Sequence, residues 1–169
     1  MIPHFLWTPF DTLTGRQVHD LLRLRQDIFI VEQNCPYPDI DGRDPTAEHL
    51  LAFDPTGKQR TLIGALRLLD GAAAPHGSPL PELPANQATT IGRIVVDAAY
   101  RGAKLGGTLL AEAIRQIDAT RHTPTIQLSA QAHLQGFYGR YGFVPVGEEY
   151  LEDGIPHVDM RRQAAGAAA

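Results

Sequence analysis

A glycine-rich segment, RGAKLGG at residues 101–107, connects an apolar run predicted to be a strand, Ile91 to Val96, with a predicted amphipathic helix, Thr108 to Ala119. Such a turn exposes backbone N–H groups at the positive end of the helix dipole. Arg101 and Lys104 add positive charge, and glycines allow close approach to the main chain. The segment therefore predicts a phosphate-binding turn.

Two common nucleotide-binding loops are excluded at this position. The spacing does not give G-x-x-x-x-G-K-[ST], and G-x-G-x-x-G is absent. The alternative interpretation is an ordinary strand-to-helix turn that carries surface charges.

A second segment, FYGRYGF at residues 137–143, precedes a predicted strand from Val144 to Glu149. The R-x-x-x-x-G turn followed by F-Y-x-x-x-G-F resembles the GNAT superfamily of acyl-CoA-dependent N-acetyltransferases. Four further segments, in the same order, resemble its ElaA-like subgroup: VEQNCPY at 31–37, IGRIVV at 91–96, SAQAHLQ at 129–135 and EDGIPH at 152–157. The resemblance extends from about Leu22 to Met160. Lys104 stands where the superfamily usually has glycine. In the ElaA-like subgroup a lysine there looks normal, so we interpret it as a variation in the contact with the pyrophosphate.

Length and composition predict one compact domain. The 169 residues are 43% hydrophobic, enough for one sizeable core. We expect this domain to span residues 1–162 and the Ala/Gly-rich residues 163–169 to form a disordered tail. The single cysteine, Cys35, excludes an internal disulfide and a cysteine-based metal site, and it is interpreted as a packed thiol.

Charge and hydropathy narrow the partners. Fifteen basic and 19 acidic side chains give a net charge of -4, without a basic patch, which argues against nucleic acid. The sequence has neither a leader-like N-terminus nor an apolar run of membrane-spanning length. We therefore expect a cytoplasmic protein with no membrane partner. The resemblance is compatible with a homodimer.

Periodicity predicts a mixed α/β protein. The predicted elements are a strand at His4–Thr8, a helix that begins with a capping box at Thr14–Gln17 and continues to Phe29, a hairpin of Glu48–Phe53 and Thr61–Leu69, a surface segment at Gly71–Gln87, and a strand at Thr125–Ser129. The resemblance implies an α/β GNAT fold, with a mixed, mostly antiparallel central sheet flanked by helices. In that fold the sheet is splayed between the fourth and fifth strands, here 91–96 and 125–129.

The resemblance also implies acetyl-CoA as cosubstrate, with its pantetheine between those two strands. A backbone N–H near Val95 would then donate to the thioester carbonyl, where negative charge develops. The implied cofactor-binding residues are Ile94, Val95, Val96, Arg101, Gly102, Ala103, Lys104, Leu105, Gly106, Gly107, Thr108, Gln131, Phe137 and Tyr138. For Gln131 the alternative is a surface residue at the entry to a helix.

Tyr138 is the implied general acid, because the family's tyrosine in this segment lies near the thioester sulfur. A phenol with a pKa of ~10 keeps its proton at neutral pH and can give it to a departing thiolate. The alternative is that Tyr138 is one more aromatic residue of a core formed with Phe137, Tyr141 and Phe143.

No carboxylate on 91–96 supplies the strand-borne base of many GNAT enzymes. His133, Glu48 and His49 are candidates for a base that acts through water, and we select His133. Arg93 either positions a substrate carboxylate or pairs with a neighbouring acid such as Asp97.

The acceptor pocket is expected between the first helix with its following loop and the last strands. Acids there favour a cationic amine: Glu32, Asp39 and Asp41 on one wall, and Glu149, Asp153 and Asp159 on the other. We expect substrate contacts from Glu32, Arg93, Glu149 and His157. His157 with Asp159 is too sparse a pair for a metal site, so no metal is expected.

The sequence thus favours an N-acetyltransferase that moves an acetyl group from acetyl-CoA to a primary amine, on a small molecule or a peptide, by direct attack in a ternary complex. Two alternatives stay open. One is an acyltransferase like the acyl-homoserine-lactone synthases, suggested by the Arg25 to Phe29 pattern. The other is a non-catalytic, regulatory module that binds acyl-CoA.

Overall fold

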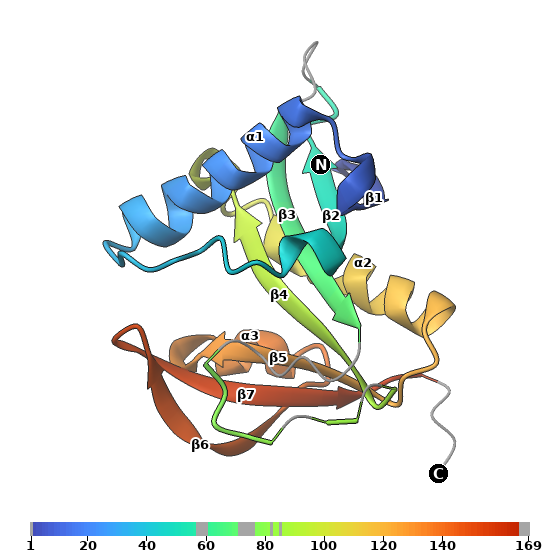
Figure 1. Cartoon of the computed structure of the whole chain (residues 1–169), viewed down its shortest axis with the longest axis vertical. Coiled ribbons are helices and arrows are strands. Elements are labelled where there is room, and N and C mark those ends of the chain that lie inside the picture. The colour runs from blue at the N-terminus through green and yellow to red at the C-terminus, as the bar shows by residue number, and fades with distance from the viewer. Residues whose placement is uncertain (1, 57–60, 71–76, 82, 85, 166–169) are drawn as a thin grey trace. The chain divides into compact units, whose positions relative to one another are not determined.

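The computed structural model describes residues 2–56, 61–70, 77–81, 83–84 and 86–165 (Figure 1). Its strands are β1 (His4–Pro9), β2 (Glu48–Phe53), β3 (Leu62–Asp70), β4 (Ala88–Val96), β5 (Thr125–Gln131), β6 (Val144–Glu152) and β7 (Ile155–Gln163). Its α-helices are α1 (Gly15–Arg25), α2 (Leu105–Thr120) and α3 (Gln135–Gly139), and α1 continues as the π-helical segment η2 (Gln26–Glu32). Short 3₁₀ turns are η1 (Phe10–Thr12), η3 (Asp44–Thr46), η4 (Ala98–Tyr100) and η5 (Ala132–Leu134). No helix in the described part of the chain is long and apolar enough to cross a membrane.

The seven strands form one sheet in the order β1-β2-β3-β4-β5-β7-β6. The pairs β1–β2, β2–β3, β5–β7 and β6–β7 are antiparallel, whereas β4 and β5 are parallel. The parallel ladder joins Ala88–Thr90 to Thr125–Gln127 and ends well before either strand does. The predicted mixed, mostly antiparallel sheet, splayed after the fourth strand, is confirmed.

The chain forms two compact units. The first comprises Met1–Leu68 and Arg93–Glu112, and the second comprises Leu69–Gly92 and Ala113–Ala169. Each unit is described by itself below. The expectation of a single domain stays a prediction.

In the first unit, helices cover both faces of the strands. The predicted capping box begins α1: Thr14 accepts the N–H of Gln17, whose side chain accepts the N–H of Thr14. The apolar face of α1 and η2 packs on β2 and β3 (Figure 1), in a core formed by Leu21, Leu24, Ile28, Leu51, Phe53, Leu62, Ala65 and Val95. On the other face, α2 lies so close to β3 that a Cβ at Gly64 would be 2.9 Å from Leu109 Cδ1.

In the second unit, β7 lies between β5 and β6. Successive side chains of β5 and β7 point to opposite faces, so one face is apolar, with Leu128, Ala130, Val158 and Met160 buried. The other face is polar and carries Ser129 and Asp159, which are directly opposite one another in the register. This polar face holds the groups that matter most for the second unit's chemistry.

Two predicted boundaries need correction, the start of α2 and the start of the C-terminal tail. Helix α2 begins at Leu105, not Thr108, because the glycines at 106 and 107 are accommodated in its first turn. Strand β7 includes Gln163, and Ala164 is buried with its N–H donated to the carbonyl of Pro124, so the fraying predicted from Gln163 does not begin there. Residues 57–60 of the predicted hairpin turn, 71–76, 82 and 85 of the predicted surface segment, and 166–169 of the tail lie outside the described residues.

Candidate functional site

The glycine-rich turn of the first unit presents the N-terminus of α2. Residues 101–104 form the turn itself, with Gly102 and Lys104 in the left-handed region at φ 83° and 60°. Thr108 donates its N–H (3.1 Å) and its hydroxyl (3.2 Å) to the carbonyl of Lys104. Helix geometry leaves the N–H groups of Leu105, Gly106 and Gly107 without an intrahelical acceptor. Those three donors therefore lie at an open helix N-terminus, the kind of group that can bind an anion, while Thr108 belongs to the helix body.

Positive charge flanks this terminus. Arg101 and Lys104 are both exposed. The Nη2 atom of Arg101 is 2.7 Å from Oε1 of Glu32, in a pair whose two side chains are each about half exposed. A phosphate at the turn would therefore compete with Glu32, predicted as a substrate contact, for the Arg101 guanidinium.

Backbone direction in β4 decides which N–H can serve a ligand. The N–H of Asp97 donates to the carbonyl of Ile63 on β3, at 2.9 Å. Alternate residues of an extended strand direct their N–H groups to the same edge, so the N–H of Val95 also faces β3. Its carbonyl, 3.2 Å from the position of a Cβ at Gly64, confirms this orientation. The N–H groups that face away from β3 are those of Ile94 and Val96, so these two are the candidates for the donor expected near Val95.

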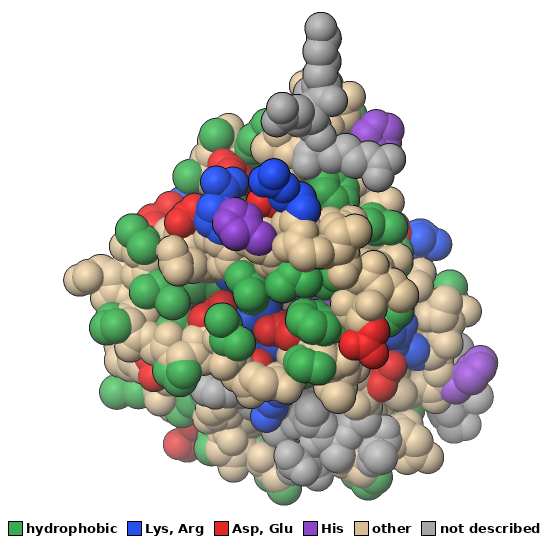
Figure 2. Space-filling view, turned by 45° about the horizontal axis from the view of Figure 1, so that its top comes forward, with side chains coloured by type: hydrophobic (Ala, Val, Ile, Leu, Met, Phe, Trp, Pro, Cys, Tyr) green, Lys and Arg blue, Asp and Glu red, His purple; other side chains and the backbone are tan. Residues whose placement is uncertain are grey.

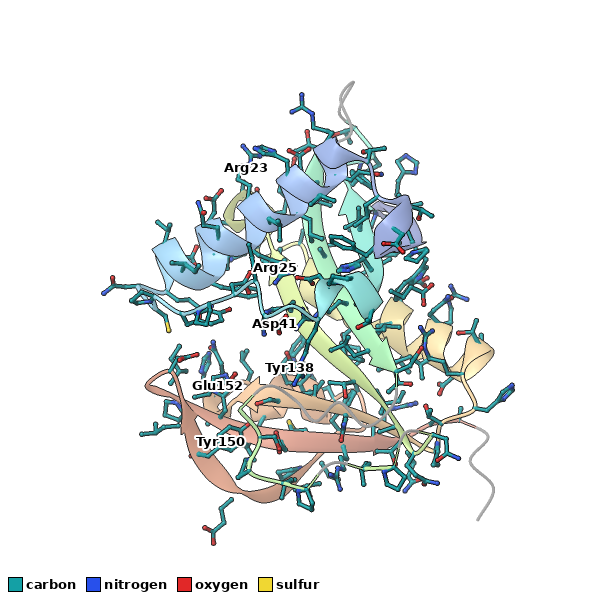
Figure 3. The ribbon with its side chains drawn as sticks, in the orientation of Figure 1. Arg23, Arg25, Asp41, Tyr138, Tyr150 and Glu152 are labelled. Carbon is teal, nitrogen blue, oxygen red and sulfur yellow. The ribbon has the colours of Figure 1, made fainter. Side chains whose placement is uncertain are left out.

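A buried ionic network, which the sequence did not reveal, lies between α1, β3 and β4. It pairs Arg25, Arg67 and Arg93 with Asp39, Asp41 and Asp44. Arg25 is 1% exposed; its Nε donates to Asp39 (2.8 Å) and its Nη1 to Asp44 (2.8 Å). Figure 3 shows Arg25 reaching from α1 toward the segment that carries Asp41. The three positive charges balance the three negative ones.

Arginine contacts control ionisation in this network. Burial by itself would raise the pKa of Asp41, but the hydrogen bonds and charge of Arg67 outweigh burial and lower it. The pKa of Asp44 is lowered in the same way, against burial, by Arg25 and Arg67. Both carboxylates therefore stay ionised at neutral pH.

Arg93 was expected to contact substrate or to pair with Asp97. Its guanidinium instead contacts Asp39 (2.8 Å) and Asp41 (3.3 Å) and lies over the ring of Tyr37, 5.6 Å from the centroid. Asp97 caps η4 by accepting the N–H of Ala99. The backbone of Arg93 is left-handed at φ 52°, a strained conformation that these ion pairs hold in place.

The prediction that Asp39 and Asp41 line an acidic wall of the acceptor pocket is wrong. Their side chains are 5% and 4% exposed, and arginines neutralise them. Beside α1 lies a hollow of about 570 Å³, lined by His19, Leu22, Arg23, Gln26, Ile30, Tyr37, Pro38, Asp39 and Ile40. Figure 2 shows basic and histidine side chains gathered over α1, above apolar ones. The lining of this hollow thus combines the guanidinium of Arg23 and the carboxylate of Asp39 with apolar side chains.

In the second unit, Tyr138 lies within an aromatic cluster. Its ring is 5.0 Å from that of Phe137 and 6.2 Å from that of Phe143, edge to face in both cases. It is 8% exposed, and burial raises its pKa to about 12. Tyr138 therefore belongs to the packed cluster and also keeps its proton at neutral pH, so both interpretations of its role are compatible with the structure.

The other predicted residues of this unit differ in exposure. Gln131 ends β5 and is half-buried, with His157 of β7 as its partner in the register. His133 is exposed in the short turn η5. Glu149 is exposed on β6 and accepts a hydrogen bond from the amide of Gln135 at 3.1 Å.

A second group missed at the sequence level lies on the polar face of β5, β7 and β6. The hydroxyl of Tyr150 donates to Asp159 (2.9 Å), and the hydroxyl of Ser129 lies 2.6 Å from the Tyr150 oxygen. Ser78 donates to the other oxygen of Asp159. Burial and Asp159 together raise the pKa of Tyr150. The neighbouring spacing in β7, His157-x-Asp159, was the available signal, because alternate strand residues share a face.

His157 stacks on Tyr150, with ring centroids 6.2 Å apart and planes inclined by 30°. Its Nδ1 is 2.8 Å from the carbonyl oxygen of Ile155, and its Nε2 is 4.0 Å from Oε2 of Glu152. Figure 3 labels Tyr150 and Glu152 on β6. Its contacts with Tyr150, Ile155 and Glu152 thus fix the orientation of the His157 ring.

The two candidates for a base besides His133 are His49 and Glu48, and both lie in the first unit. His49 is buried in the first unit, with Nε2 3.2 Å from the carbonyl of Asp44, and burial lowers its pKa. Glu48 is half-buried at the start of β2. Cys35 is buried, as expected of a packed thiol. Among the residues that the structure describes, no three His, Cys, Asp or Glu side chains group as metal ligands would.

Comparisons with known proteins agree with this architecture. The family model "Acetyltransferase (GNAT) domain" matches residues 80–164. The protein ElaA of Escherichia coli strain K12 is 40% identical over 161 residues, which cover 92% of this chain and 93% of ElaA. A crystal structure of an acyl-CoA N-acyltransferase from Pseudomonas aeruginosa superposes with a TM-score of 0.80 at 40% identity, covering 95% and 99% of the two chains. The crystal structure of E. coli ElaA gives 0.79 at 35% identity, with the same coverage.

Proposed function

The chain belongs to the GNAT family of acetyltransferases, and from that premise we propose that it transfers an acetyl group from acetyl-CoA to a primary amine. The observation that carries the proposal is the N-terminus of α2, with its three N–H groups and the exposed Arg101 and Lys104. This arrangement suits the pyrophosphate of coenzyme A. Direct attack of the amine on the thioester in a ternary complex is the simplest chemistry that requires only such a donor site.

The donor residues of the proposal follow from the geometry of β4 and the turn. Leu105, Gly106 and Gly107 donate to the pyrophosphate, and Arg101 and Lys104 supply charge. The outward N–H groups of Ile94 and Val96 are available to the amides and thioester carbonyl of the acyl-pantetheine. Gln131 contributes a side-chain amide to the pantetheine. A fixed N–H acts most strongly on negative charge that develops in the transition state.

Tyr138 is the proton donor to the leaving thiolate in this proposal. Its raised pKa, about 12, keeps the phenol protonated. The thiolate must be protonated when the C–S bond breaks, and a protonated phenol beside the sulfur provides that proton. Packing against Phe137 and Phe143 limits the rotation of the ring.

The acceptor is a primary amine, on a small molecule or a peptide. Support comes from the hairpin of β6 and β7, where Glu148, Glu149 and Asp153 are exposed and Glu152 is half-buried. Such a group of acids attracts a cationic amine before the amine loses a proton. Asp39 and Asp41 of the first unit do not contribute, because they are buried and arginines neutralise them.

The test is an assay of CoA release from acetyl-CoA across a panel of amines, with each acetylated amine identified by mass spectrometry. We expect stoichiometric CoA and N-acetyl product with at least one primary amine. Transfer of longer acyl chains onto an amine that cyclises would favour a synthase-like reaction. Binding of acetyl-CoA without product from any amine would favour a regulatory module and contradict the proposal.

A further inference from the structure

The proposed function does not yet assign a residue that removes a proton from the acceptor amine. We propose that His157 is this base, and this inference rests on the proposed function. Its Nε2 removes a proton from the acceptor ammonium, while Glu152 stabilises the resulting imidazolium.

The tautomer of His157 follows from its contact with the main chain. Nδ1 lies 2.8 Å from the carbonyl oxygen of Ile155, which can only accept a hydrogen bond. In the neutral imidazole the proton is therefore on Nδ1, and the lone pair is on Nε2. A base needs this arrangement, in which one nitrogen is anchored and the other is free to take a proton.

Glu152 and Tyr150 lie against the imidazole of His157. Glu152 Oε2 is 4.0 Å from Nε2, close enough to stabilise a positive charge. A Cβ at Gly77 would be 2.9 Å from Cδ of Glu152, so the chain at this glycine packs directly against the carboxyl group. Tyr150 lies against the imidazole ring, and its hydroxyl is fixed by Asp159. These groups come from β6, β7 and the chain before β4.

Within the second unit, His157 lies beside Gln131. His157 and Gln131 are directly opposite in the antiparallel register of β5 and β7, so their side chains share a face and lie about 5 Å apart at Cβ. Gln131 is the proposed pantetheine contact. His157 is half-buried, with 14% of its side chain exposed, whereas His133 lies exposed on η5.

The reaction balances as follows. Nε2 of His157 takes one proton from the ammonium, and the neutral amine attacks the thioester carbonyl to form the C–N bond. As the C–S bond breaks, Tyr138 protonates the thiolate. The nitrogen loses its second proton to solvent as the amide forms, solvent reprotonates Tyr138, and the imidazolium returns its proton to solvent. The sum is one N-acetyl amine, one CoA thiol and one released proton.

The variant that isolates this role is His157→Asn. Its amide nitrogen can reproduce the Nδ1 donation to Ile155, but it has no equivalent of Nε2. The matched control is His122→Asn, at an exposed histidine between α2 and β5. Circular dichroism and calorimetric titration with acetyl-CoA verify that fold and donor binding are intact.

We expect His157→Asn to lower kcat/KM by ~10² to 10⁴ and to remove the acid limb of its pH profile, and His122→Asn to change neither. Glu152→Gln should lower kcat/KM, because the imidazolium formed in the reaction loses the carboxylate beside it. Free imidazole should partly restore the activity of His157→Ala. A purely structural role for His157 predicts neither the loss of the acid limb nor the rescue.

A wild-type profile in His157→Asn, or loss of the limb in His133→Asn alone, would overturn the assignment. Long-range ¹⁵N NMR of the resting protein tests it without turnover: we expect the Nδ1–H tautomer for His157, and an Nε2–H tautomer would contradict the proposal. Failure of the proposed function is seen separately, as acetyl-CoA binding by the unmodified protein without any acetylated amine, and it would also remove this role for His157.

Discussion

Lys104 stands at a position whose backbone conformation favours glycine. Its φ of 60° is left-handed, a conformation that costs an L-residue roughly 1–2 kcal/mol and glycine almost nothing. The lysine therefore retains a strained backbone, and its exposed ammonium adds a charge beside the N-terminus of α2. A lysine in place of glycine at this position changes the charge of the turn but preserves its backbone shape.

Tyr138→Phe tests the proposed acid. Removing the hydroxyl retains the ring contacts with Phe137 and Phe143, so stability and acetyl-CoA affinity should change little. The transfer rate should fall by ~10² to 10⁴, the usual contribution of general acid catalysis. Because the pKa of Tyr138 is about 12, its loss should not alter any titration seen below that pH.

Tyr141→Phe is the matched control for this variant. Tyr141 contacts the same Phe137 ring, with centroids 5.5 Å apart, but it is half-exposed. Single-turnover kinetics should show wild-type transfer for Tyr141→Phe. Equal rates in both variants would leave Tyr138 with a packing role alone.

At the scale of the element, the N-terminus of α2 can be blocked without disturbing the fold. A Cβ at Gly106 would lie 3.8 Å from Val96 Cγ2, which is ordinary van der Waals contact. Gly106→Val should therefore fold normally but fill the space in which phosphate oxygens approach the backbone. We expect at least ~10-fold weaker acetyl-CoA binding by calorimetry, or about 1.4 kcal/mol.

The control is Ala111→Val, which introduces a valine on an exposed part of the same helix. Both variants place a β-branched residue in α2, so a shared loss of helix stability would appear in both. Unchanged acetyl-CoA affinity in Gly106→Val would exclude the turn as the pyrophosphate site.

Elements with local signals were predictable from the sequence. The capping box at Thr14–Gln17 located α1, and apolar runs located strands β1 to β6 to within about three residues, whereas β7 was not predicted. The start of α2 was placed three residues late, because glycine has low helix propensity and its tolerance in the first turn of this helix is not visible in the sequence. The fold as a whole came from the resemblance, since periodicity alone indicated only a mixed α/β protein.

At the scale of the whole molecule, the contacts that were not predicted join residues far apart in the sequence. Arg93 and Asp39 are 54 positions apart, and no local pattern reports such a pair. One signal was available: Arg67 lies in the otherwise apolar run of β3, and a buried arginine requires acidic partners.

The buried network should dominate single-site stability effects. Asp44→Asn leaves Arg25 and Arg67 buried without their shared carboxylate, and we expect the free energy of unfolding to fall by about 3–5 kcal/mol. The control is Asp20→Asn, which breaks a surface pair with His19 and should cost less than ~1 kcal/mol. Urea denaturation measures both, and equal losses would contradict the role given to the network.

The same network predicts sensitivity to acid. The pKa values of Asp41 and Asp44 are lowered in the folded protein, so the stability that they contribute is complete above the unfolded-state pKa of ~3.9. That stability is lost as pH falls below ~3.9 toward the folded pKa values, because the unfolded state binds protons first. The free energy of unfolding, measured against pH, should decline in this range, and Asp44→Asn should decline less steeply.

The most direct test of the central claim is the product of the reaction itself. The protein is incubated with acetyl-CoA and a panel of primary amines, and CoA and acetylated amine are quantified together by mass spectrometry, with Gly106→Val in parallel. The account predicts equal amounts of CoA and N-acetyl product for at least one amine, and their joint loss in Gly106→Val. Tight binding of acetyl-CoA with no acetylated amine above the protein-free background would contradict it.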